Sequence, residues 1–345
     1  MKFNNSDYLK VSQSLSKQKL HDYCISSNWD EDYVKLFPNL SAKKILELSA
    51  FHPDFRYKKL EKTIKSNFML QNIILGSGCE DLIIRLSEII TNKRLKVLIA
   101  TPTFYRISDN LKRAQKKSFE DIEKIKLEKF QALWVVNPNP LTGKVVSKKV
   151  LISLIKNNPK TLFILDETAI FFLTNWKMYS LLNECKKYKN IMVLTSLGKM
   201  HAATGLRIGF AAGNKELLKA MQNKGLTFPI SSLSEYLIRK ILSDKSFINN
   251  IRRKIKKNKT EVENILSTAK NIEIKPSVTN CVFCRYKENN LIYRKLLRLG
   301  IVSLNLDSQE GIKDKGWVRI TIHSSKIKQN NLINKLTHLI HETKN

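Results

Sequence analysis

Residues 191–213 read IMVLTSLGKMHAATGLRIGFAAG. The stretch begins with an apolar run, Ile191–Thr195, of the kind that forms a fully buried strand. A polar turn that ends at Lys199 follows, and a second apolar strand is predicted over Ile208–Ala212. The stretch therefore predicts two buried strands joined by a turn, with a lysine placed soon after the first strand ends.

Ser196, Lys199 and Arg207 have an informative spacing. They form Ser-x-x-Lys followed by Gly-Leu-Arg-x-Gly, which resembles the cofactor-lysine signature of fold-type I pyridoxal-phosphate (PLP) enzymes. The resemblance implies that Lys199 bonds covalently to the cofactor aldehyde and that Ser196 and Arg207 hold its phosphate. The residue types suit these roles, because a desolvated lysine beside another cation is partly neutral and nucleophilic, and a planar guanidinium matches a phosphate. A lone lysine would more often be a surface residue.

Length and composition are those of a globular protein. With 345 residues and 42% hydrophobic content, the chain has room for two domains, or for one large domain with an appendage. No stretch approaches the length of a membrane span, and residues 1–23 lack the apolar centre of a signal peptide. Five cysteines, an odd number, fit a reducing compartment. We therefore expect a soluble, cytoplasmic protein with no membrane partner.

Cys281 and Cys284 form a CxxC pair, but they lie in a predicted strand, where residues three apart point to opposite faces. No second Cys or His pair stands at ligand spacing, so we expect no metal site.

The formal charge of +31 raises the possibility of a nucleic-acid surface. However, the positive residues are spread along the chain. The densest run, Arg252–Lys257, is flanked by apolar residues at 251, 255, 262 and 266, which predicts the solvated face of a helix. We attribute the charge to biased composition, consider a nucleic-acid partner unlikely, and expect the charge to favour anionic substrates.

From about residue 60 onward, short apolar strands alternate with helical patterns, which is typical of βαβ units and a mainly parallel sheet. The predicted strands are Val97–Ala100, Ala132–Val136, Thr161–Leu165, Ile191–Thr195 and Ile208–Ala212. In open α/β sheets, ligands bind beyond the carboxyl ends of the strands. Most of the candidate functional residues follow such ends.

A Gly-x-Gly turn opens the segment Leu75–Ile90, LGSGCEDLIIRLSEII, and leads into an amphipathic helix. Free N–H groups and the helix dipole at such a terminus suit a phosphate. The turn resembles the PLP family's Gly-x-Gly-Ser-Asp-Glu-Leu motif, which implies that Gly78, Cys79 and Glu80 contact the cofactor phosphate. The alternative is that the acidic residues at the start of this helix, Glu80 and Asp81, only stabilise the helix dipole.

Two further turns resemble cofactor-ring contacts of the same family. Phe104 follows Pro-Thr where the family places a ring stacked on the pyridine; by itself it would more often belong to the core. The loop 137–143, NPNPLTG, resembles Asn-Pro-Asn-Asn-Pro-Thr-Gly, in which the Asn directly before Pro-Thr-Gly bonds the ring hydroxyl. A gapless match puts Pro140 there, whereas a shift of one residue puts Asn139 there. We predict Asn139, with a plain turn as the alternative.

Asp166 ends an apolar strand, where an isolated carboxylate is costly and needs a partner. It matches the family's Asp-Glu motif, which implies an ion pair with the protonated pyridine nitrogen that keeps the ring a good electron sink. Three residues on, the family usually has Tyr, and this chain has Ala169. Upstream, His52 replaces the Tyr of the family's Tyr-Pro-Asp segment, which reaches the partner subunit's cofactor.

Beyond residue 215, long helical patterns precede strands, and one of these strands contains Arg319. This resembles the family's smaller domain, where such an Arg grips the substrate carboxylate. The resemblance implies a large PLP-binding domain over 40–215 and a small α+β domain from 1–39 and 216–345.

Together the motifs resemble the class I/II aminotransferase superfamily, in the branch of histidinol-phosphate aminotransferase and threonine-phosphate decarboxylase. The resemblance implies a homodimeric aminotransferase of amino-acid biosynthesis, with PLP as cofactor and Lys199 and Asp166 as catalytic residues. A decarboxylase is the first alternative. The second alternative is a basic binding protein on a scaffold whose PLP site has decayed. The retention of four polar residues argues against it: Lys199, Asp166, Arg207 and Arg319.

Overall fold

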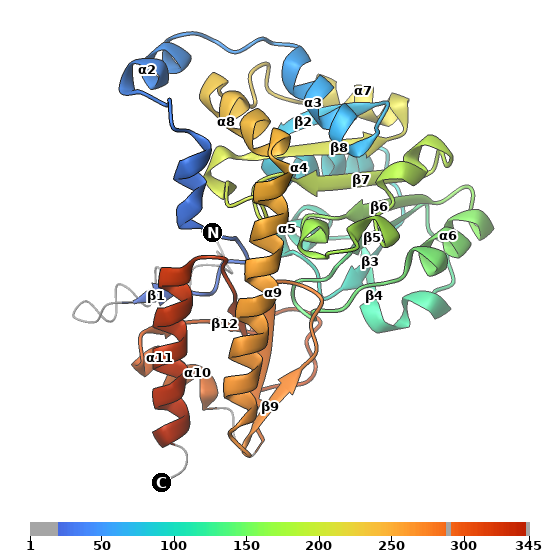
Figure 1. Cartoon of the computed structure of the whole chain (residues 1–345). Helices are drawn as coiled ribbons and strands as arrows, with labels where there is room; N and C mark the ends of the chain where they lie inside the picture. The colour runs from blue at the N-terminus through green and yellow to red at the C-terminus, as the bar shows by residue number, and fades with distance from the viewer. Residues whose placement is uncertain (1–19, 288–290, 343–345) are drawn as a thin grey trace.

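The computed structural model describes residues 20–287 and 291–342. Its strands form a seven-stranded sheet, a four-stranded sheet and a two-stranded pair, and Figure 1 shows the larger sheet above the smaller one. In spatial order, the seven strands are β2 (Ile73–Ser77), β8 (Ile208–Gly213), β7 (Ile191–Ser196), β6 (Leu162–Asp166), β5 (Ala132–Val136), β3 (Val97–Thr101) and β4 (Gln115–Ser118).

The large sheet confirms the predicted fold class. β8 is antiparallel to both β2 and β7, and all other neighbouring strands are parallel. Each of the five predicted strands is present with boundaries within one residue of the prediction. The sequence pattern does not predict the edge strands β2 and β4, because an edge strand does not need a continuous apolar run.

Alternate residues of the large sheet face two separate cores. In β5, Leu133 and Val135 belong to one core, while Ala132 and Trp134 belong to the other. The first core is covered by α3 (Lys58–Phe68), α6 (Lys148–Asn157) and α8 (Ser232–Ser243). The second is covered by α4 (Gly78–Asn92), α5 (Tyr105–Asn110) and α7 (Lys215–Asn223). The sheet is thus the middle of three layers, and this explains why its strands are apolar on both faces.

The smaller sheet is antiparallel, in the order β12 (Leu304–Asn305), β13 (Val318–Thr321), β10 (Cys281–Tyr286) and β9 (Ile272–Lys275). Its core includes residues of α9 (Lys245–Ser267), α10 (Ile292–Arg298) and α11 (Lys326–Glu342). β1 (His21–Asp22) pairs with β11 (Ile301–Val302), so the described N-terminal segment lies with the C-terminal part of the chain.

The long helix α9 connects the two parts (Figure 1). Its 23 residues span about 35 Å. Phe247, Ile251 and Ile255 pack in the core of the large sheet, and Val262 and Leu266 pack in that of the small sheet. Packing against the large sheet thus continues past residue 215, where the sequence suggested a boundary. We propose that the chain has a large and a small domain, as the sequence suggested, but that the boundary between them lies inside α9. Residues 1–19 of the expected small domain lie outside the described residues.

The remaining elements are α2 (Ala42–Ala50) and the 3-10 helices η1 (Glu31–Leu36), η2 (Phe119–Lys124), η3 (Ile170–Phe172), η4 (Trp176–Met178), η5 (Leu182–Lys186) and η6 (Thr204–Leu206). Across residues 20–287 and 291–342, none of the helices combines the length and the apolar character needed to cross a bilayer.

Candidate active site

A pocket of about 240 Å³ opens at the carboxyl ends of the central strands. Asp166 ends β6 and Ser196 ends β7, and both line this pocket. Of the residues predicted from the sequence, the pocket collects Gly78, Cys79, Glu80, Phe104, Asp166, Ser196, Lys199, Arg207 and Arg319. The predicted position of the ligand site, beyond the strand ends, therefore agrees with the structure.

The N-terminus of α4 forms one end of the pocket. The N-cap residue Ser77 makes no side-chain capping bond, which leaves the N–H groups of the first turn available to an anion. Gly78 has φ +77°, and a Cβ added there would lie 2.8 Å from an Nη atom of Arg207. Glycine is therefore required both by the backbone and by the close approach of the guanidinium. Among the described residues, Arg207 has no carboxylate partner, so this end of the pocket has a free cation beside free N–H groups.

Lys199 lies on the turn after β7 and lines the same pocket. Burial lowers the pKa of its amine, the negative charge of Asp166 opposes that shift, and the nearby charge of Arg319 adds to it. The Nζ atom donates to Ser26 Oγ at 3.4 Å. A lysine whose pKa is lowered is neutral for a larger fraction of the time, as an amine nucleophile or a proton-transfer group must be.

Asp166 is only 3% exposed, and its carboxylate is held by one neighbour. The N–H of Thr168 donates to Oδ1 at 3.0 Å, and the Thr168 hydroxyl donates to the same oxygen. Burial raises the pKa of Asp166, whereas the two Thr168 bonds and the charge of Lys199 oppose that rise. Both Thr168 donors bind Oδ1, so Oδ2 accepts no hydrogen bond from a described residue and can accept one from a ligand. Thr168 was not among the site residues predicted from the sequence.

Arg319 enters the pocket from β13 of the smaller sheet. It is 3% exposed, with Nη1 donating to the Pro140 carbonyl at 3.1 Å and Nη2 to the Cys24 carbonyl at 2.5 Å. Its Nε is buried and has no hydrogen-bond partner among the residues that the structure describes. Both observed bonds go to neutral carbonyls, so no described carboxylate balances this charge. A buried, uncompensated cation that lines a pocket is suited to binding an anionic group of the substrate.

Replacing Arg319 by Gln is expected to raise KM for an amino-acid substrate about 100-fold, because a buried charge-assisted pair is lost. Arg319→Lys keeps the positive charge but lacks the planar set of N–H donors of a guanidinium. Its KM should therefore lie between those of Arg319→Gln and wild type. The measurements are steady-state kinetics and PLP affinity by absorbance titration. Unchanged PLP affinity would locate the defect at the substrate; a wild-type KM in both variants would refute the carboxylate assignment.

Asn139 is the predicted residue that the structure does not bring to the pocket lining. Its side chain is fully buried, Nδ2 donates to the Pro102 carbonyl at 2.7 Å, and Oδ1 accepts from Leu141 N at 2.9 Å. The amide is therefore used to hold the loop together. Pro140 lines the pocket instead, as the gapless match places it, and a proline offers no amide to the ring hydroxyl.

The other two departures from the family motif have clear locations. Ala169 lines the pocket, where it leaves space but no hydrogen-bonding group. His52 is exposed and stacks on Phe228 with ring centroids 4.5 Å apart, outside the pocket of its own chain.

The pocket also contains polar residues that the sequence motifs did not predict. Two of them, Thr103 and Thr204, have buried hydroxyl groups without a partner among the described residues. Ser26, Ser27 and Gln309 also line the pocket. Ser26 and Ser27 open the sequence Ser26-Ser27-Asn28, which loosely resembles the N-terminal segment that covers the active site in the PLP family, whereas the other three residues have no such signal in the sequence.

Glu167, next to Asp166, has a different role. It is fully buried outside the pocket, accepts from Leu181 N at 2.7 Å and from the Ser180 hydroxyl at 2.5 Å, and burial raises its pKa to about 7. The native state thus holds this proton more tightly than the unfolded state. Protonation of Glu167 therefore adds to the free energy of unfolding. This contribution is fully present below pH 4.5 and is lost as the pH rises through about 7.

The free energy of unfolding of wild type, relative to Glu167→Gln, should fall by about 3 kcal/mol between pH 4.5 and pH 7.5. The amide of Gln does not titrate in this range, so the difference between the two proteins isolates Glu167. Urea unfolding at several pH values measures it. A difference that does not vary with pH would show that folding does not raise the pKa of Glu167.

The groups in the pocket fit pyridoxal phosphate. The uncapped end of α4 and Arg207 suit its phosphate, Asp166 suits its ring nitrogen, and the partly neutral Lys199 suits its aldehyde. When bound, this cofactor supplies an aldehyde that captures an amine and a ring that withdraws electrons from the substrate Cα. The mainly parallel sheet and these three positions define a PLP-dependent enzyme of fold type I.

The chain belongs to the aminotransferase class I and II family, whose model matches residues 41–336. It is therefore an enzyme of this family, and its cofactor is pyridoxal phosphate. A histidinol-phosphate aminotransferase from Bacillus cytotoxicus is 27% identical over an alignment of 294 residues, and the match covers 80% of this chain and 78% of that protein.

Two solved structures have the same fold. The histidinol-phosphate aminotransferase from Clostridium acetobutylicum matches with a TM-score of 0.82 and 23% identity, covering 94% of this chain and 100% of the other. The L-threonine-O-3-phosphate decarboxylase from Porphyromonas gingivalis matches with a TM-score of 0.79 and 20% identity, covering 92% and 99%. These comparisons confirm the family and the branch predicted from the sequence.

Proposed function

We propose that this enzyme transaminates an amino acid or a phosphorylated amino compound of the histidinol-phosphate type. The observation that supports this most directly is the position of Arg319 in the pocket that contains Lys199. This buried cation has an Nε that no group within residues 20–287 or 291–342 hydrogen-bonds. Arg319 binds the substrate carboxylate and keeps it on the substrate. Lys199 then moves the Cα proton as general acid and base.

The charge of the pocket favours an anionic substrate. Lys199, Arg207 and Arg319 line the pocket, and the net charge of the whole chain is +31. Glu80, an acidic residue of the lining, is paired with Arg106 at 2.6 Å. A phosphorylated or dicarboxylic substrate is therefore attracted to the pocket by long-range steering.

The test is the absorbance spectrum of the purified protein with PLP, recorded before and after L-glutamate is added. Transamination bleaches the visible band of the lysine-bound cofactor to the pyridoxamine form, and histidinol phosphate as donor should do the same. A band that persists with both donors would contradict the proposal. Release of CO₂ from L-threonine O-3-phosphate would instead establish the decarboxylase alternative, which the second solved structure favours.

We also propose a cytoplasmic homodimer that serves amino-acid biosynthesis. In support of a second copy, α2 buries none of its residues, and large apolar side chains are exposed on and near it: Leu46 is 70% exposed, Phe51 78% and Phe55 61%. Apolar side chains gathered in this way are typical of an interface. Light scattering should give twice the 39.9 kDa chain mass, and Leu46→Glu should reduce it to one chain.

A further inference from the structure

The segment 24–32, named here the N-terminal strap, contacts both cations that the reaction uses. The Cys24 carbonyl accepts from Arg319 Nη2 at 2.5 Å, and Ser26 Oγ accepts from Lys199 Nζ at 3.4 Å. Arg319 belongs to the smaller sheet, and Lys199 follows a strand of the larger one. The strap therefore joins the two halves of the pocket.

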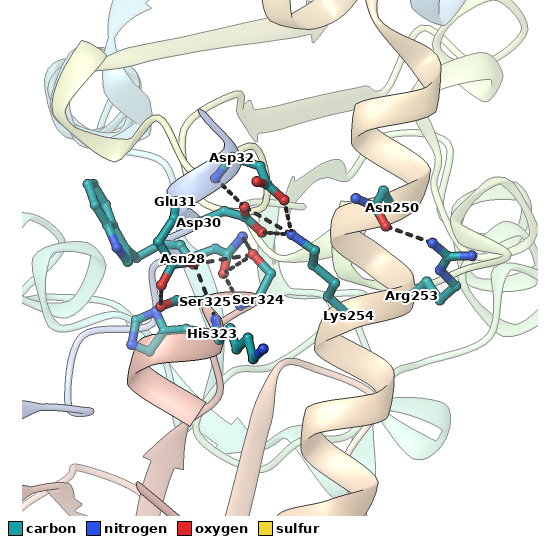
Figure 2. Close-up of polar contacts among 12 residues, drawn as sticks. Asn28, Asp30, Glu31, Asp32, Asn250, Arg253, Lys254, His323, Ser324 and Ser325 are labelled. Carbon is teal, nitrogen blue, oxygen red and sulfur yellow. Dashed lines mark hydrogen bonds and ion pairs between the residues drawn. The ribbon is translucent and has the colours of Figure 1, made fainter. Parts of the chain in front are cut away.

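Asn28, buried at 5% exposure, makes this connection rigid. Its N–H donates to the Lys199 carbonyl at 3.0 Å, and its Nδ2 donates to the Met200 carbonyl at 3.3 Å. On the other side, its Oδ1 accepts from Ser324 N at 2.8 Å (Figure 2). Ser324 comes shortly after β13, the strand that holds Arg319. One amide thus ties the lysine turn to the end of the arginine strand.

The strap is fixed from outside the pocket by an ion pair with α9. Asp30 is 0% exposed, and Lys254 Nζ lies 3.2 Å and 3.1 Å from its two oxygens and 2.6 Å from Asp32 (Figure 2). Burial alone would lower the pKa of Lys254, but the bonds to Asp32 and Asp30 raise it on balance, so the amine stays charged. A fully buried carboxylate needs such a partner.

The strap is also tied to α11. Glu31 accepts from the Ser325 hydroxyl and, at 3.1 Å, from Ile327 N, so it caps the first turn of that helix. Neither Glu31, Asp30 nor Lys254 lines the pocket. Their effect on the reaction has to pass through the strap.

We propose that Lys254 and Asp30 are a positioning pair, which holds the N-terminal strap so that Lys199 and Arg319 keep the separation that the substrate requires. The inference rests on the proposed function in one respect, that Arg319 binds the substrate carboxylate. An error of about 1 Å between two groups that act on one substrate can cost about 100-fold in rate.

The structure offers a matched control in Arg253, the residue of α9 that directly precedes Lys254. Arg253 has the same charge, is exposed, and donates through Nη2 to Asn250 on its own helix at 2.9 Å (Figure 2). In the described part of the chain, no hydrogen bond or ion pair joins it to the strap. Lys254→Met and Arg253→Met each remove one positive charge and keep a side chain that favours helix.

The test uses the full-length holoenzyme with L-glutamate as donor. Lys254→Met should lower kcat/KM by 10- to 100-fold, with a raised KM and a lowered kcat. It should also shift the pH at which the visible absorbance band of the bound cofactor is half converted, because that band reports on Lys199. Arg253→Met should stay within twofold of wild type in each quantity. Lys254→Arg should restore most of the loss, and the double variant Asp30→Asn with Lys254→Met should be no worse than Asp30→Asn alone.

The outcomes separate positioning from stability and from the proposed function. A lower melting temperature in Lys254→Met, together with wild-type kcat/KM and band titration, would overturn the inference. If that variant does not fold, Asp30→Asn, which keeps the shape of the side chain, is judged by the same three quantities. A wild-type enzyme that turns over no amino donor would count against the proposed function, and then the band titration alone decides whether the pair positions Lys199.

Discussion

Lys199→Ala should lose both the visible absorbance of the bound cofactor and at least about 10²- to 10⁴-fold of the turnover, the range that positioned proton transfer supplies. The amine lies in the pocket with a pKa lowered by burial, and no other lysine lines that pocket in the described part of the chain. Alanine can neither bond to the aldehyde nor move a proton. PLP should still bind without a covalent bond, because Arg207 and the N-terminus of α4 remain.

Two variants provide controls for this result. Lys112→Ala removes an exposed lysine from the turn before β4 and should behave like wild type in spectrum and turnover. Lys199→Arg keeps the charge but lacks a neutral amine at any ordinary pH, so it should be as inactive as the alanine variant. Substantial turnover in Lys199→Arg would show that the positive charge of this residue, and not its amine chemistry, is what the enzyme needs.

The central strands were predictable because they are buried on both faces. β5 and β7 have apolar side chains in two cores at once, so they appear in the sequence as continuous apolar runs. β4 is an edge strand with the sequence QKKS, mostly exposed, and nothing in its composition marks it as a strand. β1 has only two residues, and its pairing with β11 spans almost the entire chain.

The candidate site was predictable where a motif fixes the backbone, and less so where it depends on side-chain direction. Gly78, Asp166 and Lys199 lie at or just beyond the ends of strands, and all three line the pocket as expected. By contrast, the loop NPNPLTG offers two amides and two prolines, and only the fold shows that the Asn139 amide binds Pro102 and Leu141 instead of facing the pocket.

Long-range ion pairs leave no local pattern. The run Arg252–Lys257 is that of a solvated helix face, and Arg253, Lys256 and Lys257 are exposed as this predicts. Lys254 lies in the same run but reaches a carboxylate 224 residues away in the sequence. Neither Asp30 nor Lys254 differs in composition or spacing from its neighbours, so a single sequence could not single them out.

Asp166→Asn should lower turnover about 10²- to 10³-fold, the typical cost of removing one preorganised electrostatic group. Asn keeps the size of the side chain and an oxygen that accepts from Thr168, but it has no charge to hold a proton on the ring nitrogen. The ring then withdraws electrons less strongly from the substrate. Folding stability should change little or improve, since the buried carboxylate, whose pKa burial raises, no longer has to be desolvated.

The neighbouring Glu167 provides a control of the same chemistry. Glu167→Gln removes a carboxylate that is equally buried but lies outside the pocket, so its turnover should stay within a few-fold of wild type at pH 8. The decisive quantities are kcat and the pH titration of the visible band, measured for both variants at a temperature where both are folded. If Asp166→Asn and Glu167→Gln lose turnover equally, the loss reflects damage to the end of β6. The prediction that Asp166 acts on the ring nitrogen is then wrong. If only Asp166→Asn loses turnover and shifts the titration, the charge at the end of β6 acts on the cofactor ring itself.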